Sequence, residues 1–223
     1  MSQAPALRRE CAGERNPLVV KLQTVTDLPA DDIAALNEVC RDARELGARR
    51  NIIREGDRPE HVHLIVDGWA ARYKLLADGA RQITAFLIPG DLCDLHVTML
   101  GEMDHSISTI GRATIAFIPR KEMEALAARP NIAHAFWWST LVDEAVLRAW
   151  IVNVGRRDAY EAIGHLMCEL YVRLHNVGRA ADFRYELPLT QEEIADALGL
   201  TSVHVNRVLQ RMRSEELITL KRG

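Results

Sequence analysis

The chain has 223 residues, of which 48% are hydrophobic and 26% are charged, and its formal net charge is −3. This composition is ordinary for a globular protein with one large or two small domains, and the apolar runs are too short to span a bilayer. The small negative charge excludes a uniformly basic protein. Any binding to nucleic acid must therefore depend on a local basic patch.

The first residues, MSQAPALRRECAGERNP, carry charges but lack the apolar segment of a secretory signal, so we expect a flexible tail at 1–20. No CxxC pair occurs in the sequence. The four cysteines are widely scattered, at Cys11, Cys40, Cys93 and Cys168. This usage favours free thiols in a reducing cytoplasm over disulfides or a metal cluster.

The next segment predicts a short helix over 31–46, because apolar residues recur there at helical spacing. From about residue 50 the sequence pattern changes to short apolar runs separated by turn sequences. These are REGD at 54–57, VDG at 66–68, ADG at 77–79 and IPGD at 88–91. The cadence predicts an antiparallel sandwich or barrel, to which ISTIGRATIAFIP at 107–119 adds two strands.

A short helix in KEMEALAARP ends before Pro130, and a longer helix follows over about 131–154. On it, Trp138, Val142, Ala145, Ala149 and Val152 continue from Ala135 at alternating spacings of three and four, the pattern of two helices packed along their length. The alternative is that this seam packs on the protein's own barrel. However, Trp137, Leu147, Trp150 and Val154 lie off the seam and could serve that purpose. We therefore predict a dimer interface on the seam.

The segment NVGRRD at 153–158 mixes glycine with charge and predicts a hinge. The sequence pattern thus divides the chain into a tail at 1–20, a strand-rich domain at 21–130, which is called the sensor domain below, a helix with a predicted dimer seam and its hinge at 131–156, and a mainly helical domain at 157–223.

The last domain contains LTQEEIADALGLTSVHVNRVLQRMR at 189–213. Thr190 with Glu193 forms a capping box that starts a helix at about Gln191, and Gly199 ends it. Thr201 can cap the next helix, whose buried stripe is expected to be Val205, Val208, Leu209 and Met212. A small residue at Ala195 lets the two helices approach closely. This arrangement predicts a helix-turn-helix whose second helix enters the DNA major groove.

The exposed face of that second helix suits DNA. From Thr201 to Ser214 there are three arginines and no acid. An Arg can bind guanine as a fork, and an Asn or Gln can do the same for adenine, whereas Arg211 is better placed for phosphate. The predicted DNA-binding residues are Thr190, Thr201, Ser202, Val203, Asn206, Arg207, Gln210 and Arg211. An ordinary helical hairpin with a solvated face is the alternative.

At this point the chain, over roughly 20–220, resembles the Crp/Fnr family of bacterial transcription regulators. The run from REGD to IPGDL resembles the family's cyclic-nucleotide-binding-type barrel, and ELPLTQEEIADALGLTSVHVNRVLQRMRSEELI resembles its winged helix-turn-helix. The resemblance implies an α+β fold with an N-terminal antiparallel β jelly-roll barrel, a long dimerisation helix and a C-terminal winged helix-turn-helix. It places Ser202, Val203, Asn206 and Arg207 at base-reading positions.

The function that follows is a cytoplasmic, homodimeric regulator that reads an inverted repeat in double-stranded DNA and is controlled by an unknown effector. The resemblance also implies RNA polymerase as a partner. No membrane association and no enzymatic activity are expected, and the sequence alone does not say whether transcription rises or falls.

Three departures from the family pattern matter. Val203 stands where some members carry a Glu, so the half-site is expected to differ there. His105 and Ser106 replace the Arg-Ser pair that clamps a cyclic phosphate, so tight binding of cyclic AMP or cyclic GMP is not expected. If the pocket is used, its lining includes Asp94, Leu95, His105 and Ser106. Lastly, the sequence stops at LITLKRG, where a wing would need a second strand, so the natural protein is expected to be longer.

Other cofactors and activities are less well supported. Only Cys11 lies where iron–sulfur members cluster their cysteines, so such a cluster is not expected. Haem through His96 or His105 stays open. His61 and His63 alternate on one strand face, which leaves a metal-binding, cupin-like enzyme as the alternative function, although GDRPEHVHLIVDG lacks that family's spacing. No metal site is assigned.

Overall fold

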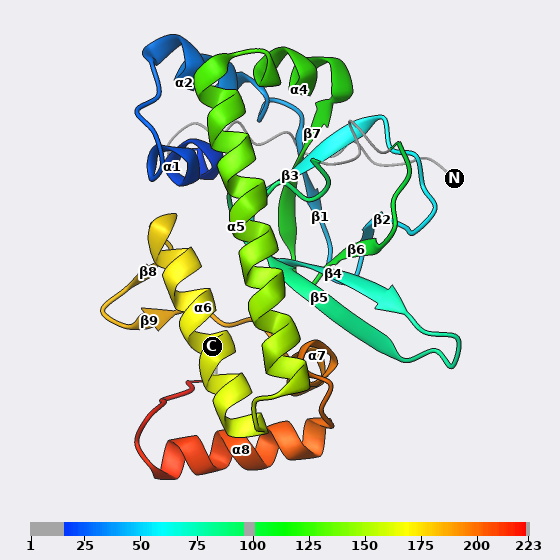
Figure 1. The fold of residues 1–223 in the computed structure, drawn as a ribbon, viewed down its shortest axis with the longest axis vertical. Helices are drawn as coiled ribbons and strands as arrows, with labels where there is room; N and C mark the ends of the chain where they lie inside the picture. The colour runs from blue at the N-terminus through cyan, green and yellow to red at the C-terminus, as the bar shows by residue number, and fades with distance from the viewer. Residues whose placement is uncertain (1–15, 96–100, 222–223) are drawn as a thin grey trace.

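The computed structural model describes residues 16–95 and 101–221 (Figure 1). Its helices are α1 (Pro17–Gln23), α2 (Ala30–Glu38), α4 (Arg120–Ala127), α5 (Pro130–Gly155), α6 (Ala159–Asn176), α7 (Gln191–Leu198) and α8 (Ser202–Ser214). Its strands are β1 (Ala43–Leu46), β2 (Asn51–Ile53), β3 (His61–Asp67), β4 (Ala70–Leu75), β5 (Arg81–Leu87), β6 (Ser106–Thr109), β7 (Ala113–Pro119), β8 (Ala180–Ala181) and β9 (Arg184–Tyr185). None of the helices in these two ranges is long and apolar enough to cross a membrane.

The strands of the N-terminal half form two antiparallel sheets, in the orders β1-β7-β3 and β2-β6-β4-β5. Both sheets contribute to one buried core, for example through Val62 and Ile115 from the first and Ile53 and Ile107 from the second. The predicted antiparallel sandwich is therefore confirmed. One of its turns needs glycine, because Gly68 has φ +77° and a Cβ there would lie 2.4 Å from a backbone oxygen.

Two expectations about the N-terminal segments are wrong. The helix expected over 31–46 ends at Glu38, and Ala43–Leu46 is instead strand β1, which pairs with β7. Helical spacing could not reveal this, because the partner of the strand is β7, which lies far away in the sequence and offers the edge that β3 does not occupy. Residues 17–20, which belong to the tail expected at 1–20, lie instead in α1, where Asn16 is the cap and Leu18 is buried. Residues 1–15 lie outside the described residues.

Helix α5 runs along the length of the molecule beside both halves (Figure 1). Ala135 and Phe136 belong to the core of the sheets, whereas Trp150 packs edge-on against Phe86 of β5, with ring centroids 5.7 Å apart. Of the four residues expected to face the protein's own barrel, only Trp150 does so. Trp137, Leu147 and Val154 are exposed, so that expectation is wrong for them.

The outer face of α5, which is its exposed apolar side, is consequently turned about the helix axis relative to the predicted seam. We define this outer face by the exposed apolar side chains Trp137, Leu141, Leu147, Ile151, Val152 and Val154. On the predicted seam, Ala145 and Val152 are exposed, while Trp138, Val142 and Ala149 are half-buried. The difference arises because the sheets and α6 pack against one side of α5, and a heptad pattern cannot show which side that is.

The C-terminal half begins at a break between α5 and α6, where Arg156 ends one helix and Asp158 caps the next by accepting from the Glu161 amide at 2.9 Å. This break lies inside the predicted hinge segment. A small hairpin, β8–β9, separates α6 from α7, although the sequence texture predicts helix there. The described residues after α8, up to 221, form no strand, so they do not form the expected wing.

Candidate DNA-binding surface and sensor junction

The helix-turn-helix has the local geometry that its sequence predicts. Thr190 Oγ1 accepts from the Glu193 amide at 3.1 Å, and Glu193 Oε2 accepts from the Thr190 amide at 2.7 Å. Gly199 ends α7 in the left-handed region at φ +66°. Ala195 and Val205 are both buried where α7 and α8 meet. The capping box, the glycine turn and the close helix packing are thus confirmed.

Helix α8 lies across the end of α5 and α6 (Figure 1). Thr201 caps it by accepting from the His204 amide at 3.2 Å. The predicted stripe is buried: Val205, Val208, Leu209 and Met212. The opposite face is exposed, and it carries Ser202, Val203, Asn206, Arg207, Gln210 and Arg211. The fold therefore leaves the predicted DNA-binding side chains of this helix accessible.

The arginines of α8 differ in their surroundings. Arg207 has no ion-pair partner within residues 16–95 and 101–221. Arg211 Nε donates to Glu215 Oε1 at 2.8 Å, and its guanidinium lies 4.6 Å from the centre of the Tyr160 ring. The hydrogen bond to Glu215 and its charge raise the pKa of Arg211. Arg207 therefore lies exposed on α8 without an ion pair in these ranges, whereas Arg211 is held beside α6.

A hydrogen bond between α7 and α8 was not anticipated from the sequence. Gln191 Nε2 donates to Asn206 Oδ1 at 3.1 Å. Gln191 is the first residue of α7, and Asn206 lies on the exposed face of α8. The two residues are 15 positions apart, and no local sequence pattern predicts the hydrogen bond between them.

The junction between the two halves contains a buried ionic network. Asp91, which follows β5, accepts from Lys21 of α1 at 2.8 Å and from Arg173 of α6 at 2.7 Å. Arg173 also donates to Glu169 at 3.1 Å and to the Phe86 carbonyl at 2.8 Å. Burial raises the pKa of Asp91, but the charges of Lys21 and Arg173 outweigh it and lower that pKa. The network fastens α6 to the sensor.

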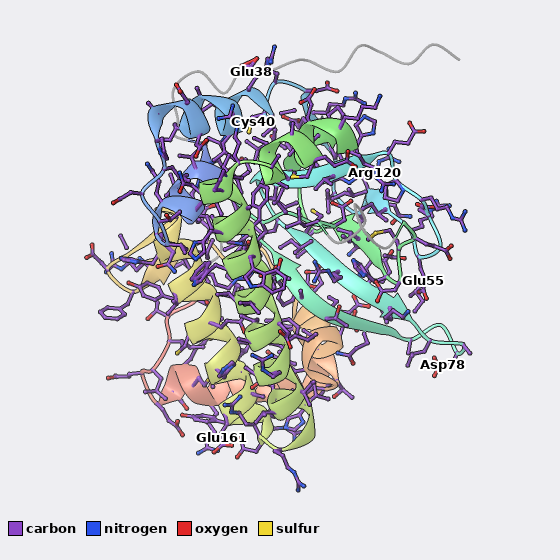
Figure 2. The ribbon with its side chains drawn as sticks, turned by 45° about the horizontal axis from the view of Figure 1, so that its top comes forward. Glu38, Cys40, Glu55, Asp78, Arg120 and Glu161 are labelled. Atoms are coloured by element: carbon purple, nitrogen blue, oxygen red, sulfur yellow. The ribbon has the colours of Figure 1, made fainter. Side chains whose placement is uncertain are left out.

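The β4–β5 hairpin makes a second connection, to α7. An Arg81 guanidinium nitrogen lies 2.7 Å from Asp196 Oδ2, and Gln82 donates to the Ala197 carbonyl at 3.1 Å. Asp78, at the tip of the same hairpin, points away from the body of the molecule (Figure 2). Apolar side chains of both halves, such as Ile83 and Leu198, belong to one core. The first helix of the helix-turn-helix is thus docked on the sensor.

The predicted effector residues are partly engaged in other interactions. Asp94 is fully buried and accepts from both the amide and the Nδ1 of His63, each at 2.8 Å. Ser106 Oγ accepts from the Glu55 amide at 3.0 Å, and His105 Nδ1 lies 2.6 Å from an Asp104 oxygen. Leu95 packs against the sandwich core. Their role in binding an effector stays a prediction.

Two grooves are lined by other residues. A groove of about 760 Å³ lies between the halves, with Trp69 and Arg112 on one side and Arg179 and Arg184 on the other. A smaller one, of about 320 Å³, includes His61 and His63 beside Phe117. In the described part of the chain, no three His, Cys, Asp or Glu residues gather in a way that could hold a metal ion. His96 and Cys11 lie outside it.

Comparison with known proteins agrees with this architecture. The family "Cyclic nucleotide-binding domain" matches residues 43–129, and the family "Crp-like helix-turn-helix domain" matches residues 161–223. The transcriptional activator protein FnrL of Cereibacter sphaeroides is 26% identical over 208 residues, which cover 86% of this chain and 78% of FnrL. The nitrogen fixation regulation protein FixK of Azorhizobium caulinodans is 28% identical over 194 residues, covering 86% and 75%.

The structure of FixK2 from Bradyrhizobium japonicum superposes with a TM-score of 0.72 at 25% identity, covering 81% of this chain and 88% of FixK2. The regulator CLP from Xanthomonas campestris shares the fold, with a TM-score of 0.66 at 14% identity over 87% and 96% of the two chains. The barrel, the long helix and the helix-turn-helix occur here in the same order. The chain therefore belongs to the Crp/Fnr family of DNA-binding transcription regulators.

Proposed function

We propose that this regulator acts as a homodimer that reads an inverted repeat with α8 and responds to an effector through its sensor. The observation that carries this proposal is the exposed face of α8. It presents Asn206, Arg207 and Gln210 on a helix whose other face is buried. Side chains of these types form the base-specific contacts of major-groove readers.

The outer face of α5 supports the dimer. Trp137 and Ile151 are each 66% exposed, and four more apolar side chains accompany them. A stripe of exposed apolar side chains of this kind is typical of an interface between chains. On the same helix face, Arg148 and Glu144 form an ion pair at 2.7 Å, which two copies could exchange. We therefore place the dimer contact on the outer face, with the seam of Trp138, Val142, Ala145, Ala149 and Val152 at its edge.

The two-fold axis of such a dimer dictates the form of the operator. Two recognition helices related by it read an inverted repeat with half-site centres roughly one turn, about 10 bp, apart. Arg207 is the best candidate for a guanine fork, since it is exposed and has no ion-pair partner in the described ranges. Ser202, Val203 and Gln210 complete the reading face, and Thr190 and Thr201 lie at the helix N-termini, where phosphates bind.

Control by an effector would act through the junction. The described conformation docks α7 on the β4–β5 hairpin and α6 on Asp91. An effector that binds differently to docked and released states would shift the balance between them. Movement at 156–158 would then change the spacing of the two recognition helices.

Cyclic AMP and cyclic GMP are not expected to be tight effectors. Ser106 already accepts from the Glu55 amide, and Asp94 is paired with His63. His105 beside Asp104 offers a cyclic phosphate no strong cationic clamp. Calorimetric titration with each nucleotide is expected to show no binding at micromolar concentration, and micromolar affinity would contradict this inference.

The proposed regulator binds chromosomal DNA in the cytoplasm. Its proposed partner is RNA polymerase, whose activity depends on whether the promoter is occupied. The named relatives are regulators, and the proposed role requires no catalytic chemistry. A direct test is selection of bound duplexes from a random DNA pool, followed by sequencing. Enrichment of an inverted repeat supports the proposal. Enrichment of a single, unrepeated site, or of none, would contradict it.

A further inference from the structure

We propose that Gln191 is a specificity-determining residue, which fixes the orientation of the Asn206 amide and thereby decides which base that residue accepts. This inference rests on the proposed function, because it takes Asn206 to be a base-reading residue. It concerns the pairing of two side chains from different helices, and it makes a prediction about one position of the operator.

The geometry of Gln191 makes it a firm anchor. It is the first residue of α7, directly after Thr190, whose amide and hydroxyl are both held by Glu193. The packing of Ala195 against the start of α8 near Val205 keeps the two helices close. From this anchored position Gln191 Nε2 reaches Asn206 Oδ1 at 3.1 Å. The amide of Asn206 is therefore oriented before DNA arrives.

Orientation decides what Asn206 can recognise. A free Asn binds adenine with both ends of its amide, accepting from N6 and donating to N7. Here Oδ1 accepts from Gln191 with one of its two lone pairs, and this hydrogen bond holds Oδ1 toward α7, so that the group turned to the DNA is Nδ2, which only donates. A donor suits a base edge that offers acceptors. Guanine, with N7 and O6, is the best such edge in the major groove.

Neighbouring readers on α8 do not share this constraint. Val203, one turn earlier, is 68% exposed and can offer only methyl groups, which suit a thymine methyl. Arg207 follows Asn206 and has no ion-pair partner in the described ranges. A change at Gln191 should therefore alter preference at the Asn206 position alone, and it should leave the positions read by its neighbours unchanged.

The test compares the unchanged protein with four variants, by selection from a random duplex pool and by titration of duplexes that differ at the affected base pair. In the unchanged protein we expect guanine to be favoured over adenine. In Gln191→Ala, Oδ1 is released, and the guanine-to-adenine ratio of affinities should fall about tenfold. In Gln191→Glu, the carboxylate should attract Nδ2 and turn Oδ1 toward the DNA, which should favour cytosine or adenine, whose exocyclic amines donate.

Glu192→Ala is the matched control, because Glu192 is the next exposed residue of α7 and has no hydrogen bond to Asn206 among the described contacts. Its loss removes a charge near the phosphates and should change affinity for all sequences alike, with the base ratio unchanged. Since Thr190 and Glu193 stay in place, α7 should keep its cap in all variants, and thermal unfolding checks this.

The outcomes separate the inference from the proposed function. If Gln191→Ala and Gln191→Glu keep the base ratio of the unchanged protein while sequence-selective binding persists, Gln191 does not set specificity, and the inference is overturned. If Asn206→Ala keeps the base preference, Asn206 is not a reader, and the inference is likewise overturned. Loss of all sequence selectivity in the unchanged protein would instead overturn the proposed function.

Discussion

The junction between the two halves and the exposed face of α8 both depend on arginine, but they use it in opposite ways. At the junction, the Arg173 side chain is only 18% exposed and binds Asp91, Glu169 and a backbone carbonyl. On α8, Arg207 is exposed and has no ion-pair partner in the described residues. Arginine therefore stabilises one conformation at the junction, whereas on α8 its side chain remains available to a ligand.

Solvent explains the difference. A cation that is largely shielded from water must be compensated within the protein, and Arg173 is paired with Asp91 of the sensor and with Glu169 of α6. An exposed cation is solvated by water, and it loses little free energy of solvation when a phosphate or a base edge replaces that water. The residues that hold the docked state are therefore at least half-buried and paired, whereas the residues that we propose to recognise DNA are exposed. Four variants, from the largest expected effect to the smallest, test this division.

The largest effect is expected from Arg173→Met, which leaves the buried Asp91 with Lys21 alone. Breaking a buried ionic network should lower the free energy of unfolding by about 3–5 kcal/mol. Denaturant titration measures this. Arg58→Met is the matched control, because the Arg58–Glu102 pair is exposed and should contribute no more than about 1 kcal/mol. Equal losses in the two variants would contradict the contrast.

The unchanged protein and Arg173→Met should also differ in how their free energies of unfolding change with pH. The folded pKa of Asp91 is lowered by Lys21 and Arg173 despite burial. A carboxyl group of this kind contributes stability above its unfolded pKa and loses it as the pH falls through the folded value. The advantage of the unchanged protein over Arg173→Met should therefore be complete at neutral pH and should shrink in acid.

The next effect concerns the outer face of α5. Ile151→Glu places a charge on an apolar stripe that we assign to the dimer, and it should raise the dimer dissociation constant roughly 30-fold or more, about 2 kcal/mol. Sedimentation equilibrium measures it. Val172→Glu is the control, since Val172 is exposed on α6 instead. Ala149→Glu tests the predicted seam: a dimer that survives Ala149→Glu but not Ile151→Glu would confine the contact to the outer face.

An effect of similar size for each half-site is expected from Arg207→Ala, which removes the proposed guanine fork. Affinity should fall by about 1–3 kcal/mol per half-site, and preference at one base position should relax. Titrations against matched and mismatched duplexes show both. An equal loss for every sequence would mean that Arg207 contacts phosphate, and the assignment of the base-reading residue would then be wrong.

The smallest effect is expected from Arg211→Ala. It should weaken binding to all sequences alike and lower the salt slope by roughly one per half-site. Because the Glu215 carboxylate accepts a hydrogen bond from Arg211, Glu215→Gln should remove the negative charge beside the guanidinium and strengthen binding without changing base preference. Titrations at several salt concentrations measure both variants. A change in base preference in either would refute a phosphate-contacting role.

Much of this protein could be read from its sequence, because the relevant physics is local. The turn glycines between β3, β4 and β5 and the capping box at Thr190 act over a few residues, and they were predicted at the correct places. The buried stripe of α8 follows from helical periodicity alone. The division of α8 into a buried and an exposed face was therefore predictable from the sequence.

Tertiary structure alone decided the features that depend on distant partners. β1 forms by pairing with the edge of β7 that β3 does not occupy, and the side of α5 that is exposed depends on where the sheets and α6 pack. Asp91 and Arg173 are 82 residues apart, and Gln191 meets Asn206 across two helices. Local patterns fix the elements and their faces, but the contacts between elements arise only when the chain brings their side chains together.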